Sequence, residues 1–264
     1  MNDALYIAAT GMQTQQLAVD TIANNMANAS TPGYKSGRVN FQELMYRDAV
    51  THTGANAGAA DPQASSPGTV QGSGVGVGSL MKSFAPGALT ATSNPLDLAI
   101  KGDGFVEVQM ADGSTAYWRG GTLQVTSDGW LATSSGQLIK PQIRVDKNVS
   151  SLVIGTDGKI STQTAGAQPV QLGQLTMHVF ANEAGLRPLG DALYQPSEAS
   201  GDASTVNTSE AAAGTFVQNA SEQSNVVLVD EMVNLMMAQR AYEMNLKVIQ
   251  TADDMISMSN NLRK

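Results

Sequence analysis

The chain has 264 residues, enough for one large hydrophobic core or for a core with extensions. Its formal net charge is −8, with 15 Lys and Arg against 23 Asp and Glu, and only 14% of its residues are charged. Because a nucleic-acid partner requires clustered basic residues that neutralise phosphates, this composition argues against nucleic acid as a partner.

Cysteine is absent, which excludes disulfides, thiolate metal ligands and thiol nucleophiles. The two histidines, His52 and His178, are too far apart in sequence to form a local ligand pair. No apolar run is long enough to span a membrane, and the first basic residue is Lys35, so the N-terminus lacks the basic region of a secretory signal peptide. We expect export, if it occurs, to use another route.

Residues 3 to 29 are predicted to form one long helix. An apolar stripe with a spacing of seven residues runs along it, and Pro32 with Gly33 ends it. Asp3 suits the positive end of the helix dipole. The residues of this stripe are Leu5, Met12, Val19 and Met26, with Ile22 in a companion position.

A second long helix is predicted at the C-terminal end, with Ser224 or Asn225 as its cap and Asp230 and Glu231 in its early turns. Arg263 and Lys264 would lie at its negative end. Its apolar stripe again has a spacing of seven residues and consists of Leu228, Leu235, Tyr242, Ile249 and Ile256.

The middle of the chain changes to a period of two, as in Val106, Val108 and Met110, which is typical of strands. Three Asp-Gly pairs predict tight hairpins, at Asp112-Gly113, Asp128-Gly129 and Asp157-Gly158. The fold class is therefore α+β, with a central, mainly antiparallel β domain. We expect a terminal helical domain over 1–34 plus 222–264, an extended Gly/Ser/Pro-rich segment over 35–79, and the β domain over 80–221.

The terminal stripes allow two interpretations. The two helices could pair within one monomer, or they could pack among copies of the chain. Residues 1–34 contain no basic residue and offer Gln, Asn, Thr and Ala on their outer positions, whereas an exposed coiled coil is normally rich in Glu and Lys. This composition favours helices that form the inner layer of a polymer, with both stripes as subunit interfaces.

Three stretches resemble the bacterial flagellar rod and hook proteins. Residues 24–35 resemble the signature that follows their first helix, residues 97–105 and 117–119 resemble the motifs that open their β domain, and residues 239–245 resemble their C-terminal helix. The family-motif residues of the two ends are Asn24, Asn25, Asn28, Thr31, Gly33, Tyr34, Lys35, Gln239, Arg240 and Tyr242. Within the basal-body rod family, the length and the segment Gly74–Gly78 are most like the distal-rod members. The chain departs from the family pattern at Val106, Trp118, Gly120 and Leu123.

The resemblance implies a structural subunit of the drive shaft that links motor to hook and encloses the export channel. It implies a homopolymer that contacts proximal rod and hook proteins at its two ends, surrounding ring or bushing proteins, and the flagellar type III export apparatus. It implies a location in the basal body across the periplasm, export without a cleaved signal peptide, no catalytic or metal-binding residue and no cofactor.

Two alternatives remain open from the residues. One is a proximal rod protein of the same family, and the other is a secreted monomeric enzyme or carbohydrate binder with a β domain. The run Gly72–Gly78 has Val77 where a dinucleotide-binding loop needs Gly, and Asp97 with Asp103 form only a chance carboxylate pair. Finally, residues 51–78 are too polar and too long for a connection within a compact domain, and we expect them to pack across neighbouring subunits.

Overall fold

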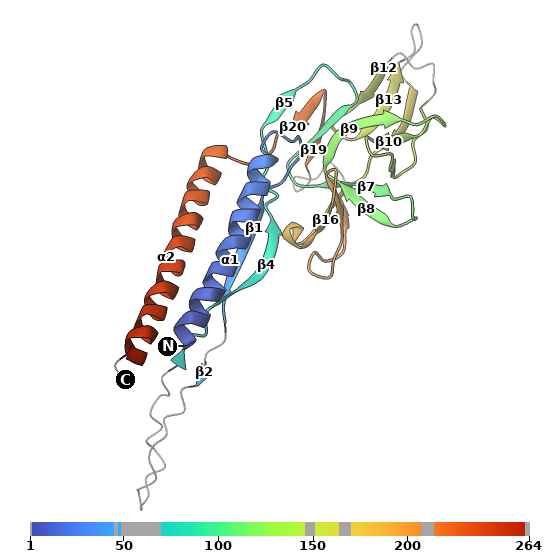
Figure 1. Cartoon of the computed structure of the whole chain (residues 1–264). Helices are drawn as coiled ribbons and strands as arrows, with labels where there is room; N and C mark the ends of the chain where they lie inside the picture. The colour runs from blue at the N-terminus through green and yellow to red at the C-terminus, as the bar shows by residue number, and fades with distance from the viewer. Residues whose placement is uncertain are drawn as a thin grey trace, which may run out of the picture. The chain divides into compact units, whose positions relative to one another are not determined.

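The computed structural model describes residues 2–44, 47–48, 70–145, 151–163, 170–206 and 214–261. The chain divides into two compact units (Figure 1). Unit 1 comprises Met1–Ala23, Arg38–Leu80 and Val229–Lys264, and unit 2 comprises Asn24–Gly37 and Met81–Leu228. None of the helices in the described part of the chain is long and apolar enough to cross a membrane.

The two predicted helices are confirmed. α1 spans Asn2–Ala27 and α2 spans Leu228–Asn261, with Asp3 in the first turn of α1 and Asp230 and Glu231 in the first turn of α2. The prediction of the α2 cap is wrong, because the helix begins three residues after Asn225, whose amide binds other backbone groups. Arg263 and Lys264 lie outside the described residues.

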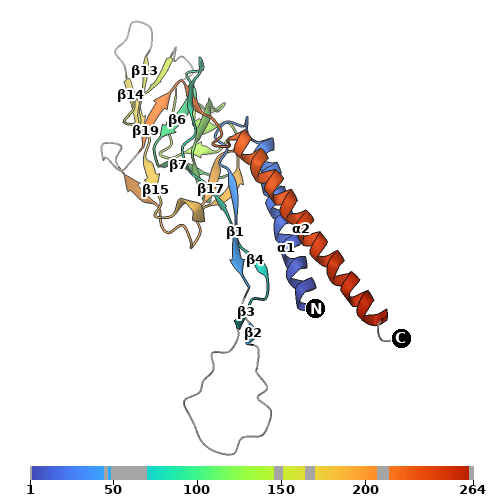
Figure 2. The same ribbon diagram turned by 90° about the vertical axis from the view of Figure 1, so that its left-hand side faces the viewer.

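In unit 1, α1 and α2 run antiparallel and side by side (Figures 1 and 2). Their close approach is recorded at Gly11, where a Cβ atom would lie 2.9 Å from Asn245 Nδ2. Ala8 of α1 and Ala238 and Ala252 of α2 are also buried. Small residues on the facing sides therefore allow the two helices to approach each other.

Unit 1 also contains two short antiparallel ribbons. β1 (Gly37–Glu43) pairs with β4 (Val75–Lys82), and β2 (Arg47–Asp48) pairs with β3 (Val70–Gln71). The run Gly72–Gly78 thus enters strand β4. Residues 51–69 of the segment expected to pack across subunits lie outside the described residues.

Unit 2 is built on one large sheet whose recorded pairings are antiparallel. Its strands, in spatial order, are β16 (Arg187–Gly190), β17 (Leu193–Gln195), β8 (Thr115–Trp118), β7 (Phe105–Gln109), β11 (Leu138–Ile139), β10 (Leu131–Thr133), β9 (Gly120–Val125), β6 (Asp97–Lys101) and β19 (Thr215–Gln218), with β15 (Met177–Val179) beside β7 and β18 (Ser204–Val206) beside β15.

Two smaller sheets and one short helix complete unit 2. A three-stranded sheet contains β12 (Ser151–Ile154), β13 (Lys159–Gln163) and β14 (Val170–Gln174), and a ribbon joins β5 (Leu89–Ala91) to β20 (Ala220–Glu222). A 3₁₀ helix, η1, spans Glu183–Gly185. All three predicted Asp-Gly hairpins are confirmed, since they join β7 to β8, β9 to β10 and β12 to β13.

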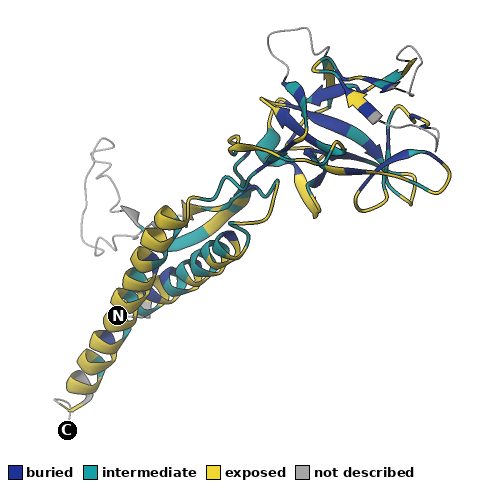
Figure 3. Cartoon of the chain, turned by 90° about the horizontal axis from the view of Figure 1, so that it is seen from above, coloured by how far each residue is buried: buried dark blue, intermediate teal, exposed yellow. Residues whose placement is uncertain are grey.

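The large sheet has a hydrophobic cluster on each face, because successive strand residues point to opposite sides. On β8, Ala116 and Trp118 enter one cluster while Tyr117 enters the other, and Val106 and Phe105 of β7 divide in the same way. The second cluster is mainly aromatic, with edge-to-face ring pairs such as Phe105 and Phe180 at 5.6 Å. Figure 3 shows this buried interior, in contrast to the largely exposed surface of α2.

Candidate functional site

The family motif after α1 folds into a compact turn within unit 2. Asn25 is 2% exposed; its side-chain amide donates to the Gly37 carbonyl at 2.9 Å, and its Oδ1 accepts from the Gly37 N–H at 2.8 Å. The Tyr34 hydroxyl donates to Asn24 Oδ1 at 2.7 Å, and its oxygen lies 3.1 Å from Asn25 Oδ1. The motif asparagines therefore bind the chain that follows the helix.

The remaining motif residues shape the turn itself. Asn28 Nδ2 donates to the Asn24 carbonyl at 2.9 Å, and Thr31 Oγ1 donates to Asn28 Oδ1 at 3.2 Å. Gly33 has a φ of 70°, a conformation that glycine adopts without steric cost, and its N–H donates to the Glu222 carbonyl at 2.7 Å. The turn thus directs the chain toward the strand that precedes α2.

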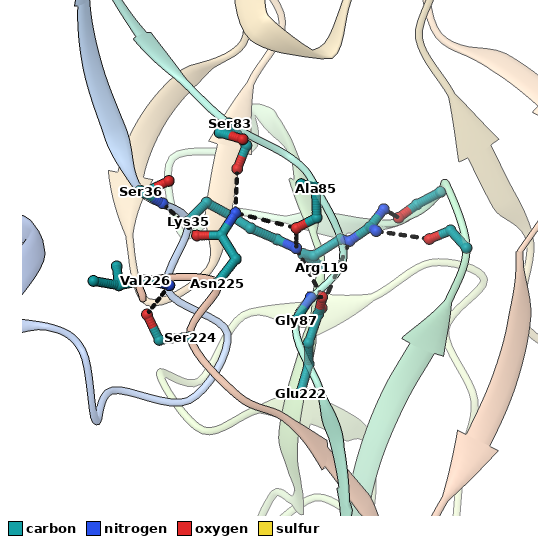
Figure 4. Close-up of polar contacts among 12 residues, drawn as sticks. Lys35, Ser36, Ser83, Ala85, Gly87, Arg119, Glu222, Ser224, Asn225 and Val226 are labelled. Carbon is teal, nitrogen blue, oxygen red and sulfur yellow. Dashed lines mark hydrogen bonds and ion pairs between the residues drawn. The ribbon is translucent and has the colours of Figure 1, made fainter. Parts of the chain in front are cut away.

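Lys35 is the centre of a buried polar cluster (Figure 4). Its Nζ lies 2.7 Å from Glu222 Oε1, with the two side chains 1% and 5% exposed, and it also donates to the Ala85 carbonyl at 3.0 Å. The Gly87 N–H donates to the same Glu222 oxygen at 2.9 Å. A lysine from the start of the chain and a glutamate near α2 are therefore joined by direct bonds.

Arg119 of the segment between β8 and β9 completes this cluster. Its side chain is 1% exposed, with Nε 3.9 Å from Glu222 Oε2. Its terminal nitrogens donate to the Gly104 carbonyl at 2.8 Å and the Gly102 carbonyl at 2.6 Å. Arg119 thus fixes the loop between β6 and β7 and places a second positive charge beside Glu222.

The side-chain amide of Asn225 binds the segment that follows the motif turn and the segment that follows β4. Its Oδ1 accepts from the Ser36 N–H at 2.7 Å, and its Nδ2 donates to the Ser83 carbonyl at 2.8 Å and the Ala85 carbonyl at 3.1 Å (Figure 4). We call the set Lys35, Arg119, Glu222 and Asn225 the polar junction. It holds together segment 33–37, segment 83–87 and the chain that leads into α2.

Burial is the largest effect on the protonation of Lys35. It lowers the pKa of the lysine below its ordinary value of 10.5, while the hydrogen bond and the charge of Glu222 oppose this change. Burial likewise raises the pKa of Glu183, and the charge of Arg119 acts against that shift. Buried charges of this kind are tolerated only where opposite charges and hydrogen bonds surround them.

Sequence reasoning found Lys35 and missed the role of its partners. Glu222 lies 187 positions from Lys35, and its local sequence contains no signal that distinguishes it from a surface glutamate. The sequence predicts Asn225 as a possible helix cap and identifies Arg119 only as part of a motif. Since β20, which contains Glu222, pairs with β5, only the folded sheet brings these groups together.

The predicted interface residues on the helices have mixed exposure. Leu228 is 48% and Tyr242 38% exposed. The others are partly buried: Leu5, Met12, Val19, Ile22, Met26, Leu235, Ile249 and Ile256. Of the C-terminal motif, Gln239 and Arg240 are exposed, and Arg240 Nη1 lies 3.0 Å from Glu243 Oε2 on the same helix.

No arrangement of groups in the described residues points to catalysis. Among them, no group of three or more His, Cys, Asp or Glu side chains could hold a metal ion. The Asp97 carboxylate accepts from Asn94 Nδ2 at 2.9 Å and from Thr122 Oγ1 at 2.8 Å, so it stabilises a turn and the neighbouring strand. The polar junction and the helix surfaces are therefore the features that bear on function.

Comparison with known proteins matches three family models to the chain. They are described as flagella basal body rod protein, over residues 5–35, flagellar hook protein FlgE/F/G D1 domain, over 99–162, and flagellar basal body rod FlgEFG protein C-terminal, over 217–262. The chain is 41% identical to the flagellar basal-body rod protein FlgG of Agrobacterium fabrum, over 98% of this chain and 99% of the relative. It is 39% identical to the FlgG of Caulobacter vibrioides, again over 98% and 99%.

The chain belongs to the flagellar basal-body rod protein family. It is a structural protein of the distal-rod type and not an enzyme, so the alternative of a secreted enzyme is set aside. The rod protein FlgF of Salmonella typhimurium is 30% identical, over 99% of this chain and 98% of the relative. This lower identity agrees with the resemblance to distal-rod members rather than to other rod proteins.

Two of the departures from the family pattern have a physical reason in the structure. Gly120 has a φ of 115°, and a Cβ atom there would lie 2.9 Å from the Leu98 carbonyl oxygen, so the pairing of β6 with β9 needs glycine at this position. Trp118 lies against Gly121, where a Cβ atom would be 3.4 Å from its ring. The indole therefore packs against Gly121, while Gly120 allows the close approach of β6.

Proposed function

We propose that this rod-family protein polymerises helically through its terminal helices and transmits torque from motor to hook. The helices would form a coiled-coil-like inner layer around the export channel, and the β domain would form an outer layer. Contacts that use a different surface on each partner leave both ends of such a polymer open. Many repeated interfaces would then share the mechanical load.

The observation that carries this proposal is the apolar surface of α2 in the single chain. Its outward positions include Met232, Met236 and Met237, which are 50%, 57% and 59% exposed. Exposed apolar side chains gathered on one element indicate a surface that another protein covers. Helices that pack among copies of the chain would bury this surface.

The partners and location implied by the family resemblance are part of the proposal. At its two ends the polymer would meet proximal rod and hook proteins, and around it lie ring or bushing proteins. The subunit would pass through the flagellar type III export apparatus without a cleaved signal peptide and would assemble across the periplasm. We also propose that the terminal helical domain and the β domain have separate roles, in assembly and in bearing load.

Leu235→Asp tests the proposal, because it places a carboxylate in an interface between helices where no cation is provided. The variant should keep the circular-dichroism spectrum of the β domain but fail to form rods, and cells that carry it should lose motility. Gln250→Asp is the matched control, since Gln250 is an exposed polar residue of the same helix. Normal rods built from Leu235→Asp, seen by electron microscopy, would refute the proposal.

A further inference from the structure

Besides the stripe identified from the sequence, α2 carries a second apolar stripe, which we call the outer stripe. Its members are spaced by four and seven residues alternately, which on a helix with 3.6 residues per turn places them within an arc of about 60°. They are Val233, Met237, Met244, Val248 and Met255, with exposed fractions of 44%, 59%, 63%, 45% and 49%.

The outer stripe cannot lie on α1 of its own chain. The side of α2 that faces α1 carries Ala238, Asn245 and Ala252, and a Cβ atom at Gly11 of α1 would lie 2.9 Å from the Asn245 amide nitrogen. The outer stripe is centred about a quarter of a turn away from that side, and its members are exposed. Another surface must therefore cover it.

Unit 1 contains a groove between α1 and β4 that we call the α1–β4 groove. It has a volume of about 540 Å³. Its apolar lining comes from Tyr6 and Leu17 of α1, Leu44 after β1, and Val75 and Val77 of β4. Tyr6 and Val77 are 58% and 39% exposed, so large apolar side chains are open to solvent on the groove side as well.

Glycine lets the β-ribbon lie close to α1 and form this groove. At Gly74 the φ is 110°, and a Cβ atom would lie 2.5 Å from Thr10 Oγ1 and 3.5 Å from the Cα of Ile7. Gly76, which lines the groove, adds no side chain to fill it. The glycines therefore keep the ribbon close to α1 and to Leu44 along one side of the groove.

The charges beside the two surfaces are complementary. The groove is edged by Asp20 and by the neutral side chains of Gln13 and Gln16, and α1 contains no Lys or Arg. Lys247 of α2, an exposed residue, lies along one border of the outer stripe, next to Arg240, which is paired with Glu243. Opposite charges at the rim of an apolar contact select the partner and fix its register.

We propose that the α1–β4 groove receives the outer stripe of α2 from a neighbouring copy of this chain. The inference rests on the proposed polymerisation and names the two surfaces that meet. Because the groove and the stripe are different surfaces, each subunit offers one to the copy before it and the other to the copy after it. Such a contact generates an open polymer rather than a closed dimer.

Disulfide trapping tests the contact, because the natural chain has no cysteine. Gln13→Cys places a thiol at the groove and Met244→Cys places one on the outer stripe. The two variants are produced together in flagellated cells as separate chains, so a heterodimer on a non-reducing gel reports a bond between copies. We expect several-fold more heterodimer from this pair than from Gln13→Cys with Gln250→Cys, whose thiol lies about a third of a turn away from Met244 around α2.

Rods are imaged in the same cells, so that the proposed contact and the proposed polymerisation are tested separately. Intact rods without the Gln13–Met244 heterodimer, or with equal trapping at Gln250, would overturn the contact but not the polymer. Absence of any homopolymer in cells that produce the natural chain would overturn the proposed function itself.

Charge exchange provides a second readout. Asp20→Lys and Lys247→Asp should each lower the number of rods per cell several-fold, because each places like charges at the contact. The double variant Asp20→Lys/Lys247→Asp should recover most of the loss, since every interface then carries the exchanged pair. Equal defects in the single and double variants would contradict the proposed register.

Discussion

Lys35 is the residue on which the polar junction depends most, because its ammonium group is the cation in direct contact with the Glu222 carboxylate. A buried ion pair adds little net stability compared with apolar residues of the same size, but loss of one partner leaves an uncompensated charge. We therefore expect the pair to act mainly by making one position of the motif segment more favourable than others. Asn225 reinforces this position with three further hydrogen bonds.

Replacement of Lys35 should be strongly destabilising. Lys35→Met leaves Glu222 buried with the Gly87 N–H and the more distant Arg119, and we expect a loss of about 3–5 kcal/mol in the free energy of unfolding. Urea denaturation followed by circular dichroism measures this loss. Lys101→Met, at an exposed position on β6, is the matched control and should change the free energy by less than about 0.5 kcal/mol. Similar effects of the two substitutions would contradict the role of the junction.

His178 is another buried group whose charge depends on pH. Its Nε2 lies 3.5 Å from Glu107 Oε2 and 3.4 Å from Thr176 Oγ1, its Nδ1 lies 3.4 Å from Thr205 Oγ1, and Tyr117 packs against the ring. Burial lowers the pKa of His178 below its ordinary value of 6.5, and the Glu107 charge only partly opposes this. The folded protein thus prefers the neutral imidazole.

The lowered pKa of His178 predicts how the stability of the protein depends on pH. Between the ordinary pKa of 6.5 and the lower folded value, the unfolded chain binds more protons, so stability falls as the pH decreases through this range. His178→Gln, which does not titrate, should flatten this part of the profile. Unfolding free energies measured from pH 7.5 to about 4.5 provide the comparison. An unchanged slope in the variant would assign the pH dependence to the carboxylates.

At the scale of elements, the three Asp-Gly turns share a sequence but differ in their surroundings. Gly113 and Gly158 have φ values of 84° and 81°. A Cβ atom at Gly113 would meet nothing within 4 Å, whereas one at Gly158 would lie 2.8 Å from the Leu175 carbonyl oxygen and 2.9 Å from the Phe216 ring. The hairpin at Gly158 is therefore packed against the core, and the hairpin at Gly113 is open to solvent.

This difference can be measured with one substitution at two sites. Gly113→Ala should cost about 1 kcal/mol of stability for the positive φ alone. Gly158→Ala should cost about 1–3 kcal/mol more, because the added methyl group cannot fit without movement of the backbone. Thermal unfolding measures both losses. Because the two glycines have similar φ values, the difference between the losses reports the steric contribution alone. Equal losses would mean that the β13 hairpin can move away from Phe216.

At the scale of the whole molecule, burial differs strongly between the units. Unit 2 has two hydrophobic clusters with many residues less than 2% exposed, while α2 in unit 1 exposes more than ten large apolar side chains. A domain with its own core can fold alone, whereas exposed apolar helices need a partner to cover them. We therefore expect unit 2 to become stable when the single chain folds, and unit 1 to become stable when copies of the chain assemble.

A fragment of residues 80–220 should fold as a soluble monomer with a cooperative thermal transition, because its hairpins and its core are self-contained. A fragment of residues 24–228 should melt at a higher temperature, since it adds the complete polar junction and the whole of β20. Calorimetry of both fragments makes the comparison. Aggregation of the shorter fragment would mean that the terminal segments complete the core.

The sequence alone determined the features that depend on local physical chemistry. The seven-residue stripes predicted both helices to within a few residues, because helical periodicity is a property of neighbouring turns. The Asp-Gly pairs predicted three hairpins, because a tight turn with positive φ needs only two suitable residues. The family motifs indicated the rod family before any fold was known.

Only the tertiary structure decided which distant groups meet. Lys35 and Glu222 are joined because the β5–β20 ribbon and the motif turn bring them together, and Asn225 binds Ser36 instead of capping α2. The outer stripe of α2 was hidden in the sequence because α2 is apolar on several sides, so periodicity cannot say which side α1 covers. Burial and contact depend on the positions of all the elements at once, and no local pattern contains that information.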